Sequence, residues 1–139
     1  IKKAGWVGMF LMGCVMVAYL TCVVAQGFNS SSYYLIRAKH SGKCLDVKDG
    51  VKNENVNIVQ SDCHGRDNQR FQLVDRQNGR YNLVAKHSGK CLTVAGNSQD
   101  KGAPIVQYSC QNSQNQQFRV NDIGSGYYTI QAVHSGKCF

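Results

Sequence analysis

Cysteine is the side chain in this sequence whose type and spacing most clearly predict chemistry. Cys63 follows Cys44 by 19 residues, and Cys110 follows Cys91 by the same interval. Paired cysteines form disulfides or bind zinc, and zinc sites usually contain a CxxC pair, which this sequence lacks. The equal spacings therefore favour the disulfides Cys44–Cys63 and Cys91–Cys110, provided that the chain is exported to an oxidising compartment.

The N-terminal segment predicts such export. Two lysines precede residues 4–25, which carry no charge, and Val23 and Ala25 form a small-residue cleavage pattern. These features are typical of a secretory signal peptide, so we expect residues 1–25 to be removed, which leaves no membrane segment. The alternative is a signal anchor, because a stretch of 22 uncharged residues can also cross a bilayer.

An internal repeat of 47 residues organises the chain after this leader. The pentapeptide HSGKC begins at His40, His87 and His134, at intervals of 47 residues. Aligned without gaps, residues 34–80 and 81–127 are identical at 19 of 47 positions. Self-similarity at such a period is typical of proteins built from repeated structural units. The three histidines recur beside a turn-forming Ser-Gly, so we expect them to face solvent rather than bind a metal.

A third copy begins at Tyr128 and is interrupted at Phe139, after 12 residues. Cys138 occupies the place of the first cysteine in each earlier pair. We therefore expect the partner of Cys138 to lie beyond Phe139, in a third repeat that this sequence contains only in part.

Short apolar stretches predict four β-strands in each copy. Turn formers such as Asp49-Gly50 and Asn78-Gly79 separate them, and no window sustains the 3.6-residue period of a helix. The fold class is therefore all-β and closed, and the period fits either propeller blades or the units of a β-trefoil. The expected strands are Tyr33–Arg37, Cys44–Val47, Ile58–Gln60, Phe71–Val74, Tyr81–Val84, Cys91–Val94, Ile105–Tyr108 and Phe118–Val120.

The charge balance is basic, but the basic residues are scattered. The sequence has 16 Lys and Arg against 8 Asp and Glu, a net charge of +8, and without the two leader lysines the net charge is +6. No run of five like charges occurs. This pattern favours anionic surfaces in general and does not mark a nucleic-acid site.

Three features of the copies resemble the ricin B-chain type lectin domain, a family of trefoil carbohydrate-binding modules. They are SGKCLDV at Ser41–Val47, QYSC at Gln107–Cys110, and the NQxF sequences at Asn68–Phe71 and Asn115–Phe118, where the family usually has NQxW. The resemblance implies a β-trefoil, in which three units around a pseudo-threefold axis form a six-stranded barrel capped by three hairpins.

On this basis we expect a linker at residues 26–32 and a lectin domain at 33–139, incomplete at its C-terminal end. Phe71 and Phe118 occupy the family's Trp position, which lies in the hydrophobic core. We therefore expect both rings to be buried, since Phe keeps the packing while losing volume.

The resemblance also implies a shallow sugar pocket in each unit. There a carboxylate and an Asn amide hydrogen-bond to sugar hydroxyls, and an aromatic ring stacks on the apolar face of the sugar. The first copy has Asp46, Asn68 and Gln69 in these places, but Ser61 stands at the stacking position. His64 is a ring that could replace the missing platform.

The second copy has the opposite composition. Tyr108 is available for stacking, and Asn115 and Gln116 are in place, but Thr93 stands where the carboxylate belongs. A neutral hydroxyl is a weaker partner than a carboxylate, although it still offers an oxygen. We expect the second pocket to be the better of two weak sites, because Ser61 offers no ring.

Catalytic sequence patterns are absent, including GxSxG, GxGxxG, GxxxxGK[ST] and HExxH. Four aspartates of the first copy have no counterparts in the second, which argues against a glycosidase carboxylate pair. These residues are Asp46, Asp49, Asp62 and Asp67. We therefore predict a protein that is not an enzyme and that uses no cofactor or metal ion.

The leading hypothesis is a secreted, extracellular lectin that binds glycans or polysaccharide, galactose-type sugars among them, and no nucleic acid. One alternative is the carbohydrate-binding module of a longer secreted glycoside hydrolase or toxin. A second is a basic trefoil that binds proteins or polyanions, which the net charge supports. Salt distinguishes this last class, because contacts with polyanions are screened whereas stacking on neutral sugars is not.

Overall fold

A computed structural model describes residues 27–139 of the chain, and the predicted leader at 1–25 lies outside the described residues. The described part consists of nine strands and four short 3-10 turns, and it contains no helix long and apolar enough to span a membrane. The strands are β1 (Tyr33–Leu35), β2 (Cys44–Val47), β3 (Val56–Ser61), β4 (Arg70–Asp75), β5 (Arg80–Ala85), β6 (Cys91–Val94), β7 (Ile105–Tyr108), β8 (Phe118–Gly124) and β9 (Tyr127–Ala132). The turns are η2 (Lys48–Gly50), η3 (Asp67–Gln69), η4 (Ala95–Asn97) and η5 (Gln114–Gln116).

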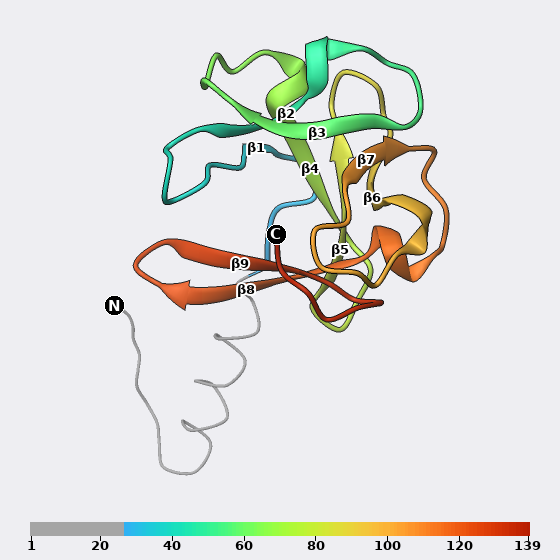
Figure 1. Ribbon diagram of the computed structural model, residues 1–139. Coiled ribbons are helices and arrows are strands. Elements are labelled where there is room, and N and C mark those ends of the chain that lie inside the picture. The colour runs from blue at the N-terminus through green and yellow to red at the C-terminus, as the bar shows by residue number, and fades with distance from the viewer. Residues whose placement is uncertain (1–26) are drawn as a thin grey trace, which may run out of the picture.

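The strand pairing follows the 47-residue repeat. Strands β2 and β3 form one antiparallel hairpin, and β6 and β7 form its equivalent in the second copy. Strand β1 pairs with β4 through Tyr34 and Phe71, and β5 pairs with β8 through the equivalent residues Tyr81 and Phe118. Figure 1 shows β2–β3 at the top of the molecule, β6–β7 at the right and β8–β9 below. All eight predicted strands are present, and the fold is the predicted all-β trefoil arrangement.

Four aromatic rings meet where the copies converge. Tyr34, Tyr81 and Tyr128 occupy equivalent positions in the repeat, and the ring of Phe28 packs against all three at centroid distances of 5.6, 5.6 and 5.3 Å. Edge-on packing of this kind adds to the stability gained from burial. Phe28, which lies in the segment expected to be a linker, thus packs against the domain.

The core consists of apolar residues that recur at equivalent positions. Phe71 and Phe118 are both 0% exposed, as predicted for the position that the family usually fills with Trp. Leu83 on β5 and Leu92 on β6 are also fully buried. Burying such side chains contributes about 1.5–3 kcal/mol each, so the repeat stabilises the fold through the contact between its copies.

Two of the three repeated histidines connect neighbouring copies rather than facing solvent. The Nε2 atom of His87 lies 3.1 Å from the carbonyl oxygen of Val51, and that of His134 lies 2.8 Å from the carbonyl oxygen of Ser98. A carbonyl only accepts a hydrogen bond, so Nε2 carries the ring proton in both. His40 is exposed, as predicted for all three. The prediction was therefore wrong for His87 and His134, which reach the preceding copy.

An apolar cavity of about 1030 Å³ opens between the sheet and the β8–β9 hairpin. Leu35, Ile58, Ile130 and Phe139 are among the side chains that line it. Cys138 also lines it and, within residues 27–139, is the cysteine without a disulfide partner.

The two predicted disulfides are present, and each lies within one copy. Cys44 is bonded to Cys63 and Cys91 to Cys110, with Cα atoms 5.1 and 5.0 Å apart. Each bond links the first strand of an outer hairpin to the loop that follows its second strand, so it closes the base of that hairpin.

Removal of the first disulfide should destabilise the fold. We expect the double variant Cys44→Ser, Cys63→Ser to lose about 3 kcal/mol of unfolding free energy, because the unfolded chain regains the entropy of an open loop. Urea denaturation followed by circular dichroism measures the change. Cys138→Ser is the matched control and should stay within about 0.5 kcal/mol of the parent chain. Peptide mapping that joined Cys44 to Cys91 would contradict this assignment.

Candidate functional site

The outer hairpins bring the predicted site residues of each copy onto one face. In the first hairpin Asp46 pairs with Val59 and Cys44 with Ser61, so Asp46 and Ser61 share a face of the antiparallel pair. In the second hairpin the same register places Thr93 and Tyr108 together. The register therefore places the two predicted positions of each hairpin on a common face.

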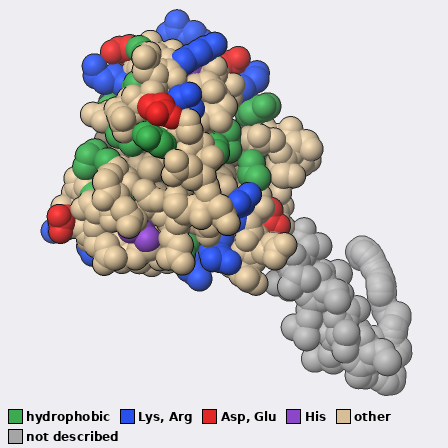
Figure 2. All heavy atoms as spheres, turned by 90° about the vertical axis from the view of Figure 1, so that its right-hand side faces the viewer, with side chains coloured by type: hydrophobic (Ala, Val, Ile, Leu, Met, Phe, Trp, Pro, Cys, Tyr) green, Lys and Arg blue, Asp and Glu red, His purple; other side chains and the backbone are tan. Residues whose placement is uncertain are grey.

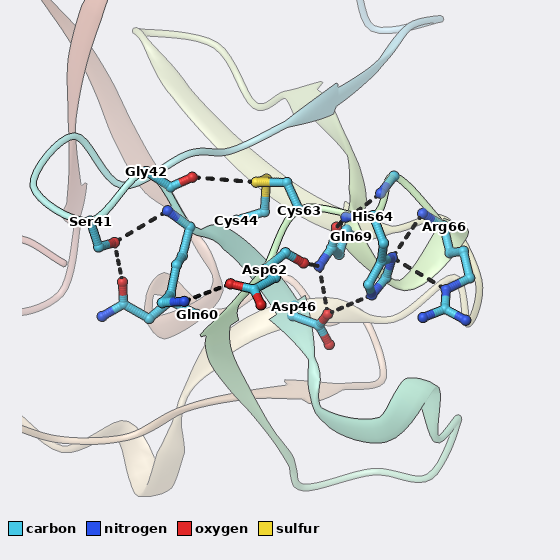
Figure 3. The surroundings of a disulfide bond; sticks show 12 residues. Ser41, Gly42, Cys44, Asp46, Gln60, Asp62, Cys63, His64, Arg66 and Gln69 are labelled. Carbon is cyan, nitrogen blue, oxygen red and sulfur yellow. Dashed lines mark hydrogen bonds and ion pairs between the residues drawn. A yellow bond between two sulfur atoms is a disulfide. The ribbon is translucent and has the colours of Figure 1, made fainter.

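A buried glutamine amide organises the first site (Figure 3). Gln69 Nε2 donates to Asp46 Oδ2 at 2.8 Å and to the Asp62 carbonyl at 2.9 Å. Gln69 Oε1 accepts from the backbone N–H groups of His64 and Gly65 at 2.9 and 3.1 Å. All four hydrogen-bonding positions of this amide are occupied, and Gln69 is 0% exposed. Gln69 therefore supports the pocket from beneath and does not form its surface.

The Asp46 carboxylate is surrounded by donors. Besides Gln69, the Asn68 amide donates to Oδ1 at 2.9 Å, and His64 Nε2 lies 3.2 Å from Oδ2. The N–H of Arg66 donates to His64 Nδ1 at 3.1 Å, so the proton of a neutral ring is on Nε2, which faces the carboxylate. The side chain of Asp46 is 6% exposed and that of His64 is 29% exposed. His64 is thus the more accessible member of this pair, and Figure 3 shows its ring between Asp46 and Arg66.

The second site repeats this design with one group changed. Gln116 Nε2 donates to Thr93 Oγ1 and to the Ser109 carbonyl, both at 2.9 Å, and Gln116 Oε1 accepts from the N–H of Gln111 at 2.6 Å. The Thr93 hydroxyl donates inward to the Cys91 carbonyl at 3.0 Å. Thr93 therefore has no proton to offer a ligand and presents at most one acceptor position. Gln116, which is 1% exposed, supports this site as Gln69 supports the first.

Asn68 and Asn115, at the edges of the two proposed pockets, make equivalent hydrogen bonds to the backbone. Asn68 Nδ2 donates to the Val47 carbonyl at 3.2 Å, and Asn115 Nδ2 donates to the Val94 carbonyl at 3.0 Å. Both side chains are half-buried. Within residues 27–139 no protein group donates to Oδ1 of either amide. Each asparagine therefore presents an acceptor oxygen at the margin of its pocket.

A loop of the first copy positions the strand end that carries Tyr108, which sequence analysis did not foresee. Gln107 Nε2 donates to the carbonyls of Val51 and Asn53 at 2.9 and 2.5 Å. Glu54 accepts hydrogen bonds from the hydroxyl and the N–H of Ser109, and these bonds hold the pKa of the Glu54 carboxyl below its usual value. The sequence signal available for this contact was that Gln60 and Gln107 are identical residues at equivalent positions of the repeat.

The surface charge is dispersed around these sites. Figure 2 shows Lys and Arg side chains in several separate places, with Asp and Glu side chains between them. Lys43 lies 2.6 Å from Asp62 and Lys86 lies 3.0 Å from Asp67, and the first of these contacts holds the pKa of the Asp62 carboxyl below its usual value. Among the described residues no cluster of three His, Cys, Asp or Glu side chains could hold a metal ion.

Repeated hairpins of the same register, each closed by a disulfide and a buried glutamine amide, define a β-trefoil of the lectin type. The ricin-type β-trefoil lectin domain-like family matches residues 23–108 and 75–139. The chain belongs to this family. No curated protein matches it.

Solved structures share this fold. A designed threefold-symmetric protein, ThreeFoil, is 47% identical, with a TM-score of 0.75 over 76% of each chain. An exo-beta-1,3-galactanase from Clostridium thermocellum is 39% identical, with a TM-score of 0.72 over 76% of this chain and 23% of the enzyme. A Polyporus squamosus lectin, solved bound to the epitope Neu5Aca2-6Galb1-4GlcNAc, is 17% identical with a TM-score of 0.64, over 76% of this chain and 37% of the lectin. These likenesses support the fold, and membership of the lectin-like family supports carbohydrate binding as the function.

Replacing the buried amide should cost stability. We expect Gln69→Leu to lower the unfolding free energy by about 3 kcal/mol, because the Asp46 carboxylate and two backbone N–H groups lose a buried partner. Gln60→Leu is the matched control, since Gln60 is exposed and hydrogen-bonds to Ser41 alone, and it should cost about 0.5 kcal/mol or less. Urea denaturation compares the two variants, and equal losses would contradict the supporting role of Gln69.

Proposed function

We propose that this chain is a secreted lectin that binds glycans without catalysis, through one shallow pocket per unit. The observation that carries the proposal is the paired network of the two sites, in which Gln69 and Gln116 hold Asp46 and Thr93 in equivalent positions on the outer face. Membership of the lectin-like family supports carbohydrate as the ligand. The two disulfides support an extracellular location, because such bonds persist in oxidising compartments.

The second pocket binds mainly through stacking. Tyr108 is half-buried and shares its face with Thr93, so its ring is available to the apolar side of a pyranose. Asn115 supplies an acceptor oxygen beside it. Thr93 adds one weak acceptor because its proton is used by the Cys91 carbonyl. Affinity in this pocket therefore depends on the tyrosine ring.

The first pocket binds mainly through hydrogen bonds. Asp46 receives donors from Asn68 and Gln69 and faces His64 Nε2, which leaves few of its lone pairs for a sugar. Ser61 provides no stacking surface. His64 is accessible and can either stack on a sugar or move aside to release a carboxylate oxygen. We therefore rank this pocket below the second.

Each pocket should bind a monosaccharide weakly. A stacked ring adds about 0.5–1.5 kcal/mol beyond burial, and a charge-assisted hydrogen bond adds about 1.5–3 kcal/mol. A pocket that has only one of these groups is expected to bind with a dissociation constant of about 1 mM. Useful retention then requires several pockets on one polymeric glycan.

A second candidate function is that of a binding module within a longer secreted enzyme. The likeness to the exo-beta-1,3-galactanase favours it, since the matching part is 23% of that enzyme's chain. The galactanase also makes galactose-type sugars the first ligands to test. Both candidates assign the same binding role to the residues described here.

Loss of the stacking ring should weaken binding more than loss of the carboxylate. We expect Tyr108→Ala to reduce retention on immobilised β-1,3-galactan about tenfold, and Asp46→Ala to reduce it less. Tyr33→Ala is the matched control, because Tyr33 is a 46% exposed tyrosine on β1 that is not assigned to either pocket, and it should leave retention unchanged.

Circular dichroism should first establish that each of these variants is folded. Abolition of retention by Asp46→Ala, with Tyr108→Ala unchanged, would instead assign binding to the first pocket with His64 as its ring. Retention that falls steeply with added salt would favour a polyanion ligand over a neutral glycan.

Restoring the missing carboxylate should strengthen the second pocket. In Thr93→Asp the new side chain can accept from Gln116 Nε2 as Asp46 accepts from Gln69, so the first site provides the template. We expect retention on galactan to rise about tenfold, since a charge-assisted hydrogen bond replaces a neutral one. Thr93→Asn has nearly the same shape without the charge and should give a smaller gain. Equal retention of all three chains would show that this position does not contact the glycan.

A further inference from the structure

A second cavity is polar and lies next to the turn Gln114–Gln116, which carries Asn115 and Gln116 of the second lectin pocket. Its volume is about 490 Å³, and it lies between the turn that joins β4 to β5 and the loop that leads into β8. Arg76, Arg80, Asn112 and Gln117 are among its lining residues. None of the residues assigned to the two lectin pockets lines it.

Two buried atoms in the residues of this cavity have no protein partner. Arg80 Nε is a donor and Gln117 Oε1 is an acceptor, and within residues 27–139 neither makes a hydrogen bond. Gln117 is 7% exposed, and its Nε2 donates weakly to Asn112 Oδ1 at 3.5 Å. Buried polar groups in proteins are nearly always paired, so an unpaired donor and an unpaired acceptor on two residues that line one cavity point to a ligand that supplies both partners.

The cavity is also electropositive. Neither Arg76 nor Arg80 forms an ion pair with a carboxylate of the described chain. Arg76 instead donates to Asn112 Oδ1 at 3.2 Å, and Asp75, the acidic lining residue, accepts from the N–H of Gln77 at 2.8 Å. Two guanidinium groups without counter-ions favour an oxyanion, because a guanidinium matches the oxygens of a carboxylate or a sulfate.

This arrangement occurs once and not in each repeat. One repeat later, Ile123 and Tyr127 take the places of Arg76 and Arg80. The cavity is therefore a feature of the junction between the first and second units, separate from the repeated pockets of the fold.

We propose that this cavity is a binding site for an acidic saccharide. The oxyanion would pair with Arg76 and Arg80, and a neighbouring sugar hydroxyl would donate to Gln117 Oε1. Uronic acids and sulfated sugars share this chemistry of an oxyanion beside a hydroxyl group. The site goes beyond neutral glycan binding and requires neither Tyr108 nor Asp46.

The test is a titration of the full chain, followed by ¹H–¹⁵N NMR, with D-glucuronate, glucose 6-sulfate and D-glucose. We expect the Arg80 Nε–H signal to shift with the two acidic sugars and to stay in place with glucose at the same concentration. The ratio of the two dissociation constants shows whether a carboxylate or a sulfate is preferred. If neither acidic sugar moves this signal, the cavity holds only water and the proposal is wrong.

Variants distinguish binding of an acidic sugar in this cavity from the general attraction of an anion to a basic protein. Arg76→Gln and Arg80→Gln should each weaken binding of the preferred acidic sugar about tenfold. Arg119→Gln is the matched control. Arg119 is the strand partner of Arg80 across β5 and β8, but it is exposed and does not line the cavity. This variant should change binding of the acidic sugar less than twofold. An equal loss in Arg119→Gln would overturn the proposal. Retention of the two cavity variants on neutral galactan should stay unchanged. A failure of the proposed acidic-sugar site can therefore be distinguished from a failure of the proposed lectin function.

Discussion

The buried glutamine amide in each unit is the interaction on which both the scaffold and the site depend. Gln69 and Gln116 connect the first strand of an outer hairpin, the loop after its second strand and the turn that begins the next strand. A buried amide left unpaired costs free energy, so these three segments have to close around it. The same hydrogen bonds orient the side chain of Asp46 or Thr93 at the base of the pocket. Stability and ligand geometry therefore come from one set of contacts.

The buried glutamine is the same in both copies, whereas the side chains that it supports differ. The first unit keeps a carboxylate beside Ser61, and the second keeps a tyrosine beside Thr93. Outer-face residues contribute little to the core, so they can change without loss of the fold. The apolar positions have no such freedom, because Phe71 and Phe118 fill equivalent places in a close-packed interior. The scaffold is thus symmetric, whereas the proposed binding chemistry is not.

Neighbouring units also complete each other. Gln107 and His87 of the second unit bind the carbonyl of Val51 in the first, and Glu54 of the first accepts two hydrogen bonds from Ser109 beside Tyr108. Phe28 contacts an equivalent tyrosine of each copy. The strand end that carries Tyr108 is consequently held by both units, and the polar cavity at Arg76 and Arg80 lies where these units meet.

Sequence alone determined the fold class, the eight predicted strands and the disulfide pairs, because a repeat exposes local patterns that recur at one spacing. It did not determine which polar side chains are buried. Gln69 looks like its neighbour Asn68 in the sequence, yet only packing shows that the first is enclosed and the second reaches the pocket edge. It also could not place His87 against Val51, or Arg80 and Gln117 in the lining of one cavity, because these residues belong to different units. Such long-range neighbours are decided by how the units pack, and the tertiary structure alone contains that information.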